Sequence, residues 1–368
     1  MIKKQIILFI IFGNIHFMIK KIDILNLNRE QIFKIFNSID EKSYRIQQVM
    51  QWIHKFGTKD FLNMTNINKK FRNYLNSTFK VELPSIAGFK KSKDGTCKWL
   101  LKLKCKNYIE TVFIPEKKRK TLCISSQIGC IANCSFCYTG KMGFSRNLSL
   151  SEILGQIWLV NKNLNRKKKV YNDKNITNIV IMGMGEPLFN FKNIINAINI
   201  IADKFTYNIP QKKITLSTVG IVPILKKLYY TTSIGIAISL HAPNEELRNI
   251  LVPINKKYPL FNLIKLCKEI FNKNQKRKVT FEYIMLKNIN DQSIHADQLI
   301  KLLNNILAKV NLIPFNMFPH SKYESSSMEV IKKFNKKLLN NGIYSSIRKT
   351  RGLDINASCG QLYSKIKM

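Results

Sequence analysis

Short apolar runs alternate with amphipathic runs along most of this chain of 368 residues. The apolar runs are rich in β-branched residues and have the length of buried strands, whereas the runs between them repeat apolar residues at helical spacing. Such alternation predicts βα units on a parallel sheet. With one more strand, 123–129, ahead of a cysteine-rich loop we count about six units, fewer than the eight of a closed barrel. The apolar runs are 178–183, 213–218, 235–240, 278–286 and 309–316.

The region before these units has a different pattern and predicts a small helical domain. Asn28 and Gln31 have the spacing of a helix-capping pair, and apolar residues follow them at helical intervals. A second amphipathic run, 44–57, ends at a glycine. Residues 91–104 instead predict a β-hairpin around an Asp-Gly turn. We therefore expect an N-terminal extension at 1–22, a helical accessory domain at 23–95, an α/β core at 96–349 and a C-terminal loop at 350–368.

The apolar run at 5–18 could be mistaken for a membrane anchor or a signal peptide. It is shorter than the roughly 20 apolar residues that span a bilayer, and polar residues interrupt it. No small-residue cleavage site follows. The tetrapeptide MIKK opens the chain and recurs at 18–21, so Met18 is an alternative start. We expect no membrane association.

The charge balance indicates a polyanionic partner. Lys and Arg number 61 and Asp and Glu number 22, which gives 61 − 22 = +39. Only ten of the 61 cations are Arg, so compositional drift toward Lys accounts for part of this excess. Nucleic acid remains the first candidate partner, and the loop at 161–175 is unusually basic.

Three of the eight cysteines lie close together in the sequence GCIANCSFCYTG: Cys130, Cys134 and Cys137. This spacing indicates a metal or cluster site in a reducing compartment rather than a disulfide scaffold. Thiolates select zinc or iron–sulfur clusters. Zinc would need a fourth ligand from elsewhere in the chain, whereas three cysteines on a [4Fe–4S] cluster leave one iron open for another ligand. Cys97, Cys105 and Cys267 match no motif.

Polar residues follow several of the predicted strands. Because the active sites of such folds lie at the carboxyl ends of the strands, we expect these residues to meet on one face. They are Gly183–Pro187, Ser217, Ser239–His241 and Asn316.

These features together resemble the radical S-adenosylmethionine (SAM) enzymes, and within them the RlmN-type RNA adenine C2-methyltransferases. The resemblance implies a partial (β/α)6 barrel, the radical SAM core at 96–349, behind a small helical domain at 23–95 that binds RNA. It covers nearly the whole chain and rests on the segments 108–148, GMGEPL, LSTVG, SLHAPNEELRNILVPINKKY, IPFN and RGLDINASCGQL.

The resemblance implies a [4Fe–4S] cluster on the three clustered cysteines, with SAM on the open iron. The C2 atom of adenine is electron-poor and cannot attack a methyl sulfonium, so the methyl must arrive by radical chemistry, which cofactors supply. By resemblance, Cys359 is methylated first and two SAM molecules are consumed per turnover. Cys123 then releases the product by forming a disulfide with Cys359.

The remaining roles are also those that the resemblance implies. Glu110 removes the C2 proton, with Cys123 as a competing candidate. SAM contacts fall on Gly185, Glu186, Ser217, Ser239, Leu240, His241 and Asn316.

The expected substrates are 23S rRNA, at the peptidyl transferase centre, and an anticodon-loop adenine of tRNA. We expect a cytoplasmic monomer that takes electrons from a donor such as flavodoxin. A C8-methyltransferase acting on the same rRNA adenine is an alternative, because the shared motifs discriminate poorly. A zinc-stabilised RNA-binding module without catalytic activity is a more distant one.

Overall fold

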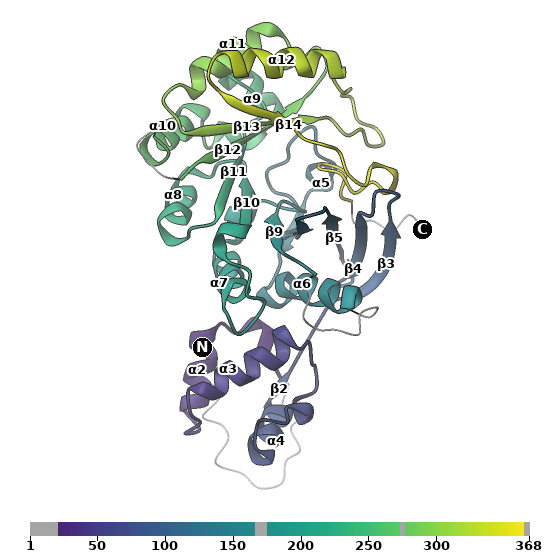
Figure 1. Ribbon diagram of the computed structural model, residues 1–368, viewed down its shortest axis with the longest axis vertical. Coiled ribbons are helices and arrows are strands. Elements are labelled where there is room, and N and C mark those ends of the chain that lie inside the picture. The colour runs from purple at the N-terminus through teal and green to yellow at the C-terminus, as the bar shows by residue number, and fades with distance from the viewer. Residues whose placement is uncertain (1–20, 166–174, 273–276, 364–368) are drawn as a thin grey trace.

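The computed structural model describes residues 21–165, 175–272 and 277–363, which form a small helical domain and a larger α/β domain (Figure 1). The extension expected at 1–22 lies almost entirely outside these residues, as does most of the basic loop expected at 161–175. Within the three described ranges, no helix is long and apolar enough to cross a membrane.

The helical domain contains the capping box predicted from its sequence. Asn28 Oδ1 accepts a hydrogen bond from Gln31 N, and Gln31 Oε1 accepts one from Asn28 N, both at 2.9 Å. Phe36 packs edge to face against Phe71 and Phe79 in the core of this domain. The elements are β1 (Ile22–Asp23), η2 (Ile24–Asn26), α2 (Arg29–Asn37), α3 (Tyr44–Met50), η3 (Gln51–Lys55), η4 (Phe61–Asn63), α4 (Lys69–Thr78) and β2 (Phe79–Lys80), with β1 and β2 paired in parallel.

Helix α6 (Leu150–Asn165) is one of the elements of the larger domain that contact the helical domain. Trp158 is buried and its Nε1 donates to Ile53 O at 2.9 Å. At the start of the same helix, Ser151 N donates to Asn26 Oδ1 at 3.0 Å. Because both bonds join a helix of the core to the small domain, the two domains meet at a defined interface.

The larger domain is built on one ten-stranded sheet in the order β14-β13-β12-β11-β10-β9-β6-β5-β4-β3. Its first seven strands in that order are parallel, and β5, β4 and β3 extend the sheet in antiparallel fashion. The strands are β3 (Ser85–Lys91), β4 (Cys97–Lys102), β5 (Tyr108–Pro115), β6 (Lys120–Cys123), β9 (Asn178–Ile181), β10 (Ile214–Thr218), β11 (Gly235–Ser239), β12 (Val279–Met285), β13 (Ala308–Pro314) and β14 (Tyr344–Ile347).

Helices connect successive parallel strands, as the alternating pattern predicts, so the partial (β/α)6 barrel is confirmed. Their apolar faces pack on the sheet, because parallel strands must be covered to remain buried. Besides α6, they are α7 (Phe191–Ala202), α8 (Val222–Thr231), α9 (Glu245–Leu251), α10 (Leu260–Ile270), α11 (Ser293–Leu303) and α12 (Met328–Asn340), with 3-10 turns η5 (Pro187–Asn190), η6 (Gln211–Lys213), η7 (Pro253–Lys256) and η8 (Leu353–Ile355).

Two details differ from the sequence-based expectation. Strand β14 was not predicted, because its sequence, YSSI, is half polar. The strand expected at 123–129 is divided: β6 ends at Cys123, and β7 (Gln127–Gly129) pairs instead with β8 (Phe144–Asn147) in a separate small sheet. The division carries the chain from the large sheet into the cysteine-rich loop, which leads to the short helix α5 (Tyr138–Lys141).

The predicted hairpin around the Asp-Gly turn joins β3 to β4. Strand β3 lies within the range expected for the helical domain, 23–95, yet it belongs to the large sheet. The C-terminal segment, drawn in yellow, runs from β14 toward this hairpin (Figure 1). Three contacts fasten it there: Ser92 Oγ donates to Asp354 Oδ1 at 2.6 Å, Gly352 N to Asp94 Oδ2 at 3.0 Å and Lys98 Nζ to Asn356 O at 2.9 Å.

Candidate active site

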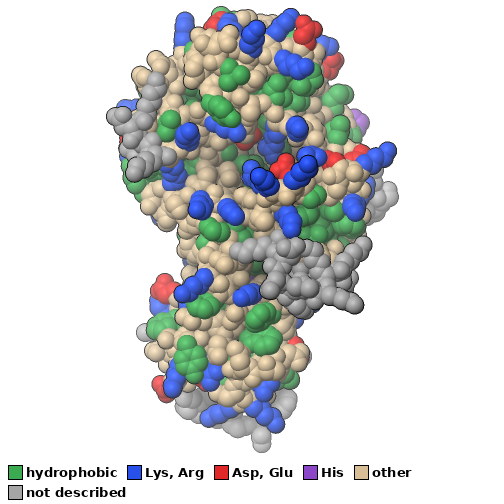
Figure 2. Space-filling view, in the orientation of Figure 1, with side chains coloured by type: hydrophobic (Ala, Val, Ile, Leu, Met, Phe, Trp, Pro, Cys, Tyr) green, Lys and Arg blue, Asp and Glu red, His purple; other side chains and the backbone are tan. Residues whose placement is uncertain are grey.

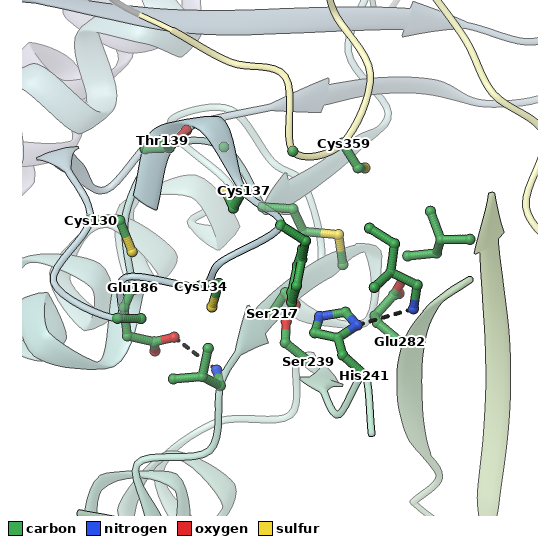
Figure 3. Close-up of a pocket in the computed structure, with 18 of the residues that line it drawn as sticks. Cys130, Cys134, Cys137, Thr139, Glu186, Ser217, Ser239, His241, Glu282 and Cys359 are labelled. Atoms are coloured by element: carbon green, nitrogen blue, oxygen red, sulfur yellow. Dashed lines mark hydrogen bonds between the residues drawn. The ribbon is translucent and has the colours of Figure 1, made fainter. Parts of the chain in front are cut away.

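A cavity of about 860 Å³, open to solvent, lies at the carboxyl ends of the parallel strands (Figure 3). Strands β10, β11, β12 and β13 contribute residues to its wall, as do the cysteine-rich loop and the C-terminal segment. The strand-end residues expected to meet on one face therefore do so for the most part. The predicted site residues that line the cavity are Cys130, Cys134, Cys137, Gly185, Glu186, Ser217, Ser239, His241 and Cys359.

The cysteine-rich loop is held in a tight turn between β7 and β8. Gly129 has a φ of +72°, and a Cβ at this position would lie 1.8 Å from Gly143 O. Cys130 N donates to the same oxygen at 2.9 Å. A side chain at Gly129 would therefore separate the two strands that position Cys130.

The three clustered thiols are suited to bind a metal or a metal cluster. Burial raises the pKa of Cys130 to about 12, with the charge of Cys137 adding to it, and burial also raises the pKa of Cys134 and Cys137. Thiolates at these positions therefore need a compensating metal. No group of three or more His, Cys, Asp or Glu in the described ranges lies in the arrangement of a single metal ion site. The three thiols share the wall of a larger cavity, and this donor set fits an iron–sulfur cluster.

Glu186 occupies the turn after β9 and is buried. Its Oε1 accepts hydrogen bonds from Leu188 N at 3.0 Å and Thr218 Oγ1 at 2.7 Å, and its Oε2 accepts one from Val219 N at 2.8 Å. Burial raises the pKa of this carboxyl to about 7, although the three donors oppose the rise. The donors fix its orientation at the cavity wall, where an ammonium group would stabilise the charged form.

His241 follows β11 in the left-handed region, with a φ of +61°. Its Nδ1 accepts a hydrogen bond from Ile284 N at 3.1 Å, and its ring packs edge to face on Phe136 at 4.6 Å (Figure 3). Burial lowers the pKa of His241 to about 3. The ring is therefore neutral at physiological pH, and since Nδ1 is an acceptor, Nε2 carries the hydrogen.

Arg248, on α9, organises the strand ends behind the cavity. It is fully buried, and its guanidinium donates to Leu240 O at 3.1 Å and Val219 O at 2.7 Å. Leu240 does not line the cavity; it is buried and contributes this carbonyl. The hydroxyls of Ser217 and Ser239 lie 3.2 Å apart across the same two strands.

Cys359 is brought to the cavity by the C-terminal segment. Asn316 Nδ2 donates to Cys359 O at 3.2 Å, and Asn316 lines a neighbouring cavity rather than the one that holds the three clustered cysteines. Arg348 and Glu282 complete this part of the wall, with Arg348 Nη1 3.6 Å from Glu282 Oε2. Asn316 thus fixes the backbone that carries the Cys359 thiol.

Cys123 and Glu110 lie behind the wall and do not line the cavity. Burial raises the pKa of Cys123 to about 12; the charge of Cys359 adds to the rise and Arg348 opposes it. The two thiols are thus near enough to interact electrostatically, although both are reduced. Glu110 Oε1 lies 2.8 Å from Lys98 Nζ, its Oε2 accepts from Tyr363 N at 2.8 Å, and burial raises its pKa.

Three residues of this site were missed by the sequence analysis: Arg248, Glu282 and Arg348. Glu282 offered a signal, since it is an acidic residue within the apolar run 278–286, and the structure shows it 4% exposed. A charged residue in a buried strand is rare unless it is paired. Arg248 lies in a segment that was recognised as a whole, but its buried role depends on long-range contacts that no local pattern reveals.

Comparisons with known proteins agree with this geometry. Residues 22–81 match the family model "Ribosomal RNA large subunit methyltransferase N-terminal domain", and residues 124–299 match "Radical SAM superfamily". The chain is 47% identical over 347 residues to "Dual-specificity RNA methyltransferase RlmN" of Pseudomonas fluorescens, covering 94% of this chain and 91% of that protein.

A solved structure gives the same result for the fold. The crystal structure of a radical SAM methyltransferase from Sphaerobacter thermophilus superposes with a TM-score of 0.85 at 34% identity, covering 93% of this chain and 99% of that one. Identity of this level over nearly the full length of both chains shows that they share a family and not only a fold. The chain therefore belongs to the RlmN family of radical SAM methyltransferases.

Proposed function

We propose that the protein methylates C2 of an adenine in 23S rRNA and of an anticodon-loop adenine in tRNA. Its relative from P. fluorescens is described as a dual-specificity RNA methyltransferase. The observation that carries the proposal is the position of Cys359, which lines the same cavity as Cys130, Cys134 and Cys137 and interacts electrostatically with Cys123. A residue that first accepts a methyl group and later forms a disulfide must lie near the three clustered cysteines and also near Cys123.

Membership of the family implies SAM and an iron–sulfur cluster, and the finer assignment of ligands belongs to this proposal. Cys130, Cys134 and Cys137 hold the cluster. Glu186 accepts from the ammonium group of SAM, and the backbone near Gly185 approaches it closely. Ser217, Ser239, Leu240, His241 and Asn316 complete the SAM site. When bound, these groups supply a methyl group and one-electron chemistry that amino acid side chains cannot provide.

The two remaining cysteines act in sequence. The Cys359 thiolate accepts a methyl group by displacement. Once the carbon of that group is bonded to C2 of the adenine, the Cys123 thiolate attacks the sulfur of Cys359. An S–S bond forms and the C–S bond breaks; its electron pair goes to the carbon, which takes up a proton to complete the methyl group. A thiol reductant then reopens the disulfide and restores both thiols.

Glu110 accepts the proton from C2, with Cys123 as the competing candidate. Its two oxygens are occupied by Lys98 and by the backbone of Tyr363. Burial raises its pKa, which suits a group that must take up a proton and return it near neutral pH. Since Tyr363 is part of the C-terminal segment, movement of that segment would free one oxygen of Glu110 for the substrate.

The proposal includes the cellular setting. The enzyme acts in the cytoplasm as a monomer and receives electrons from a reduced donor such as flavodoxin. The net charge of +39 supports an RNA substrate.

The test is to map methyladenosine isomers by mass spectrometry in rRNA and tRNA treated with the anaerobically purified, cluster-loaded protein. We expect 2-methyladenosine in both RNAs, and none with the Cys359→Ala variant. Formation of 8-methyladenosine would overturn the proposal in favour of C8 methylation. Product in rRNA alone would remove the tRNA part of the proposal.

A further inference from the structure

A second cavity adjoins the main one across Cys359. It measures about 370 Å³, including its open mouth, and shares Ile313, Arg348 and Cys359 with the main cavity. The thiol thus lies on the boundary between two cavities, only one of which contains the three clustered cysteines. A residue that meets SAM first and RNA second needs one partner on each side, so the second cavity lies on the RNA side under the proposed function.

The lining of this second cavity is cationic. Arg348, Lys349 and Arg351 contribute to it, together with the hydroxyl-bearing residues Thr350 and Ser358; no carboxylate among the described residues lines it. Asn316, which the proposed function assigns to the SAM site, also borders this cavity and donates to Cys359 O, so it lies at the boundary between the two sides. Lys and Arg side chains also stand around the hollow of the larger domain on the face shown in Figure 2. Adenine is uncharged, so a site for the base alone does not require three cations.

Some N–H groups of these cationic side chains remain free to donate hydrogen bonds to a ligand. Arg348 Nη1 is 3.6 Å from Glu282 Oε2, and Arg351 Nη1 is 4.0 Å from Asp94 Oδ2, so neither ion pair has hydrogen-bond geometry. Arg351 Nε is buried with no hydrogen-bond partner in the described ranges.

Lys349 is exposed, and among the residues that the structure describes its Nζ makes no ion pair. Glu116 also acts on Arg348 electrostatically, in addition to Glu282.

We propose that this cavity, lined by Arg348, Lys349 and Arg351, is a subsite for a backbone phosphate of the RNA strand, adjacent to the adenine that reacts at Cys359. The inference rests on the proposed RNA substrate and adds the point at which the strand is held. An Arg guanidinium offers two parallel N–H donors that match phosphate oxygens, and a Lys ammonium adds charge. A phosphate fixed next to Cys359 sets the position of the neighbouring base relative to the thiol.

The experiment measures binding of the full-length protein to an anticodon stem–loop RNA in which single phosphates around the target adenine are replaced by uncharged methylphosphonates. We expect one linkage whose neutralisation weakens binding severalfold in the wild type but produces little further loss in Arg351→Gln or Lys349→Gln. The slope of log Kd against log salt should also fall by about 0.7–0.9 in each variant, as expected for one lost phosphate contact.

The matched control is Lys332→Gln on α12, which removes the same charge from another exposed lysine outside both cavities. Its binding and salt slope should equal those of the wild type. If Lys332→Gln and Lys349→Gln weaken binding equally, or if no linkage couples to the variants, the phosphate subsite is refuted. Binding is measured separately from methylation. If the protein methylates RNA but no linkage couples to the variants, only this inference is refuted. If a linkage couples to the variants but no methylation occurs, only the proposed function is refuted.

Discussion

The cysteine-rich loop and the C-terminal segment both bring cysteines to one cavity, but they are held in different ways. The loop places Cys130, Cys134 and Cys137 within eight residues and is closed by local contacts, among them the approach of Gly129 to Gly143. The C-terminal segment is held mostly by contacts with residues more than 200 positions away in sequence, on the β3–β4 hairpin, on Glu110 and on α5, besides the bond from Asn316.

This difference fits the tasks that the two regions have under the proposed function. The ligands of a permanently bound cofactor must stay in place, and a short loop keeps them there. A cysteine that meets two partners in turn must be placed accurately in one state and released in another. Hydrogen bonds at the surface of a docked segment can be broken without unfolding the domain.

The largest expected effect is the loss of the cluster. Replacing Cys134 by Ala should abolish bound iron and all activity, because it removes one of three ligands and leaves no substitute nearby. Iron and sulfide are measured on anaerobically purified protein. Cys97→Ala is the control, since Cys97 is buried outside the cavity and should leave iron content unchanged. Full iron content in Cys134→Ala would refute the three-ligand assignment.

The next prediction separates the two cysteines that act in sequence. Cys359→Ala should retain the cluster but form no product, because the methyl acceptor is missing. Cys123→Ala should stall after the carbon–carbon bond forms and accumulate protein covalently bound to RNA through Cys359. Nuclease digestion and peptide mass spectrometry detect the attached nucleotide. An unmodified Cys359 peptide together with normal product formation would rule out this order of events.

A smaller effect is expected when the docking of the C-terminal segment is weakened. Lys98 Nζ contacts both Glu110 Oε1 and Asn356 O, at 2.8 and 2.9 Å. Lys98→Met should lower the methylation rate by about tenfold, which corresponds to about 1.4 kcal/mol, because it removes one contact that docks the segment and leaves the Glu110 carboxylate without its cation. Iron content should not change.

The control for this prediction is Lys102→Met, which alters an exposed lysine on the same strand. It should leave the methylation rate at the wild-type value. If both variants lost activity equally, or if Lys98→Met also lost iron, the distinction between the two regions would fail.

The smallest expected effect concerns the pH dependence of stability that arises from His241, whose ring packs on Phe136 of the cysteine-rich loop. Burial lowers the pKa of His241 to about 3, below its ordinary value of 6.5. Its contribution to stability is therefore present above pH 6.5 and is lost as the pH falls from 6.5 toward 3, by up to about 1.4 kcal/mol per pH unit.

The measurement is the free energy of unfolding of the cluster-free protein between pH 7 and pH 5. His241→Asn should show a shallower loss, because Asn tolerates the positive φ and can accept from Ile284 N but does not titrate. Identical pH slopes for the two proteins would show that His241 titrates normally.

The sequence predicted the parts of the molecule that depend on local pattern. The parallel strands follow from apolar runs, the capping box from Asn28 and Gln31, and the hairpin from its Asp-Gly turn. Family resemblance added Cys359, which nothing in its local pattern distinguishes from an ordinary loop thiol. The roles assigned to the site residues stay predictions until they are measured.

What the sequence did not predict depends on contacts between distant segments. Arg248 is fully buried among carbonyls from two strand ends, and Glu282 and Arg348 meet only because β12 and the end of β14 are separated by a single strand. Strand β14 itself has a polar sequence that local propensity does not favour. In each case tertiary contacts outweigh the local signal.

Among the residues that the structure describes, the ten-stranded sheet does not close on itself, since β14 and β3 are its two edges and no ladder joins them. Here the interval between the edge strands is spanned by a segment held through side-chain contacts on Ser92, Asp94 and Lys98. Because this segment is held by side-chain contacts and not by a strand ladder, its displacement under the proposed function would let a folded RNA present one nucleotide to Cys359 from that side.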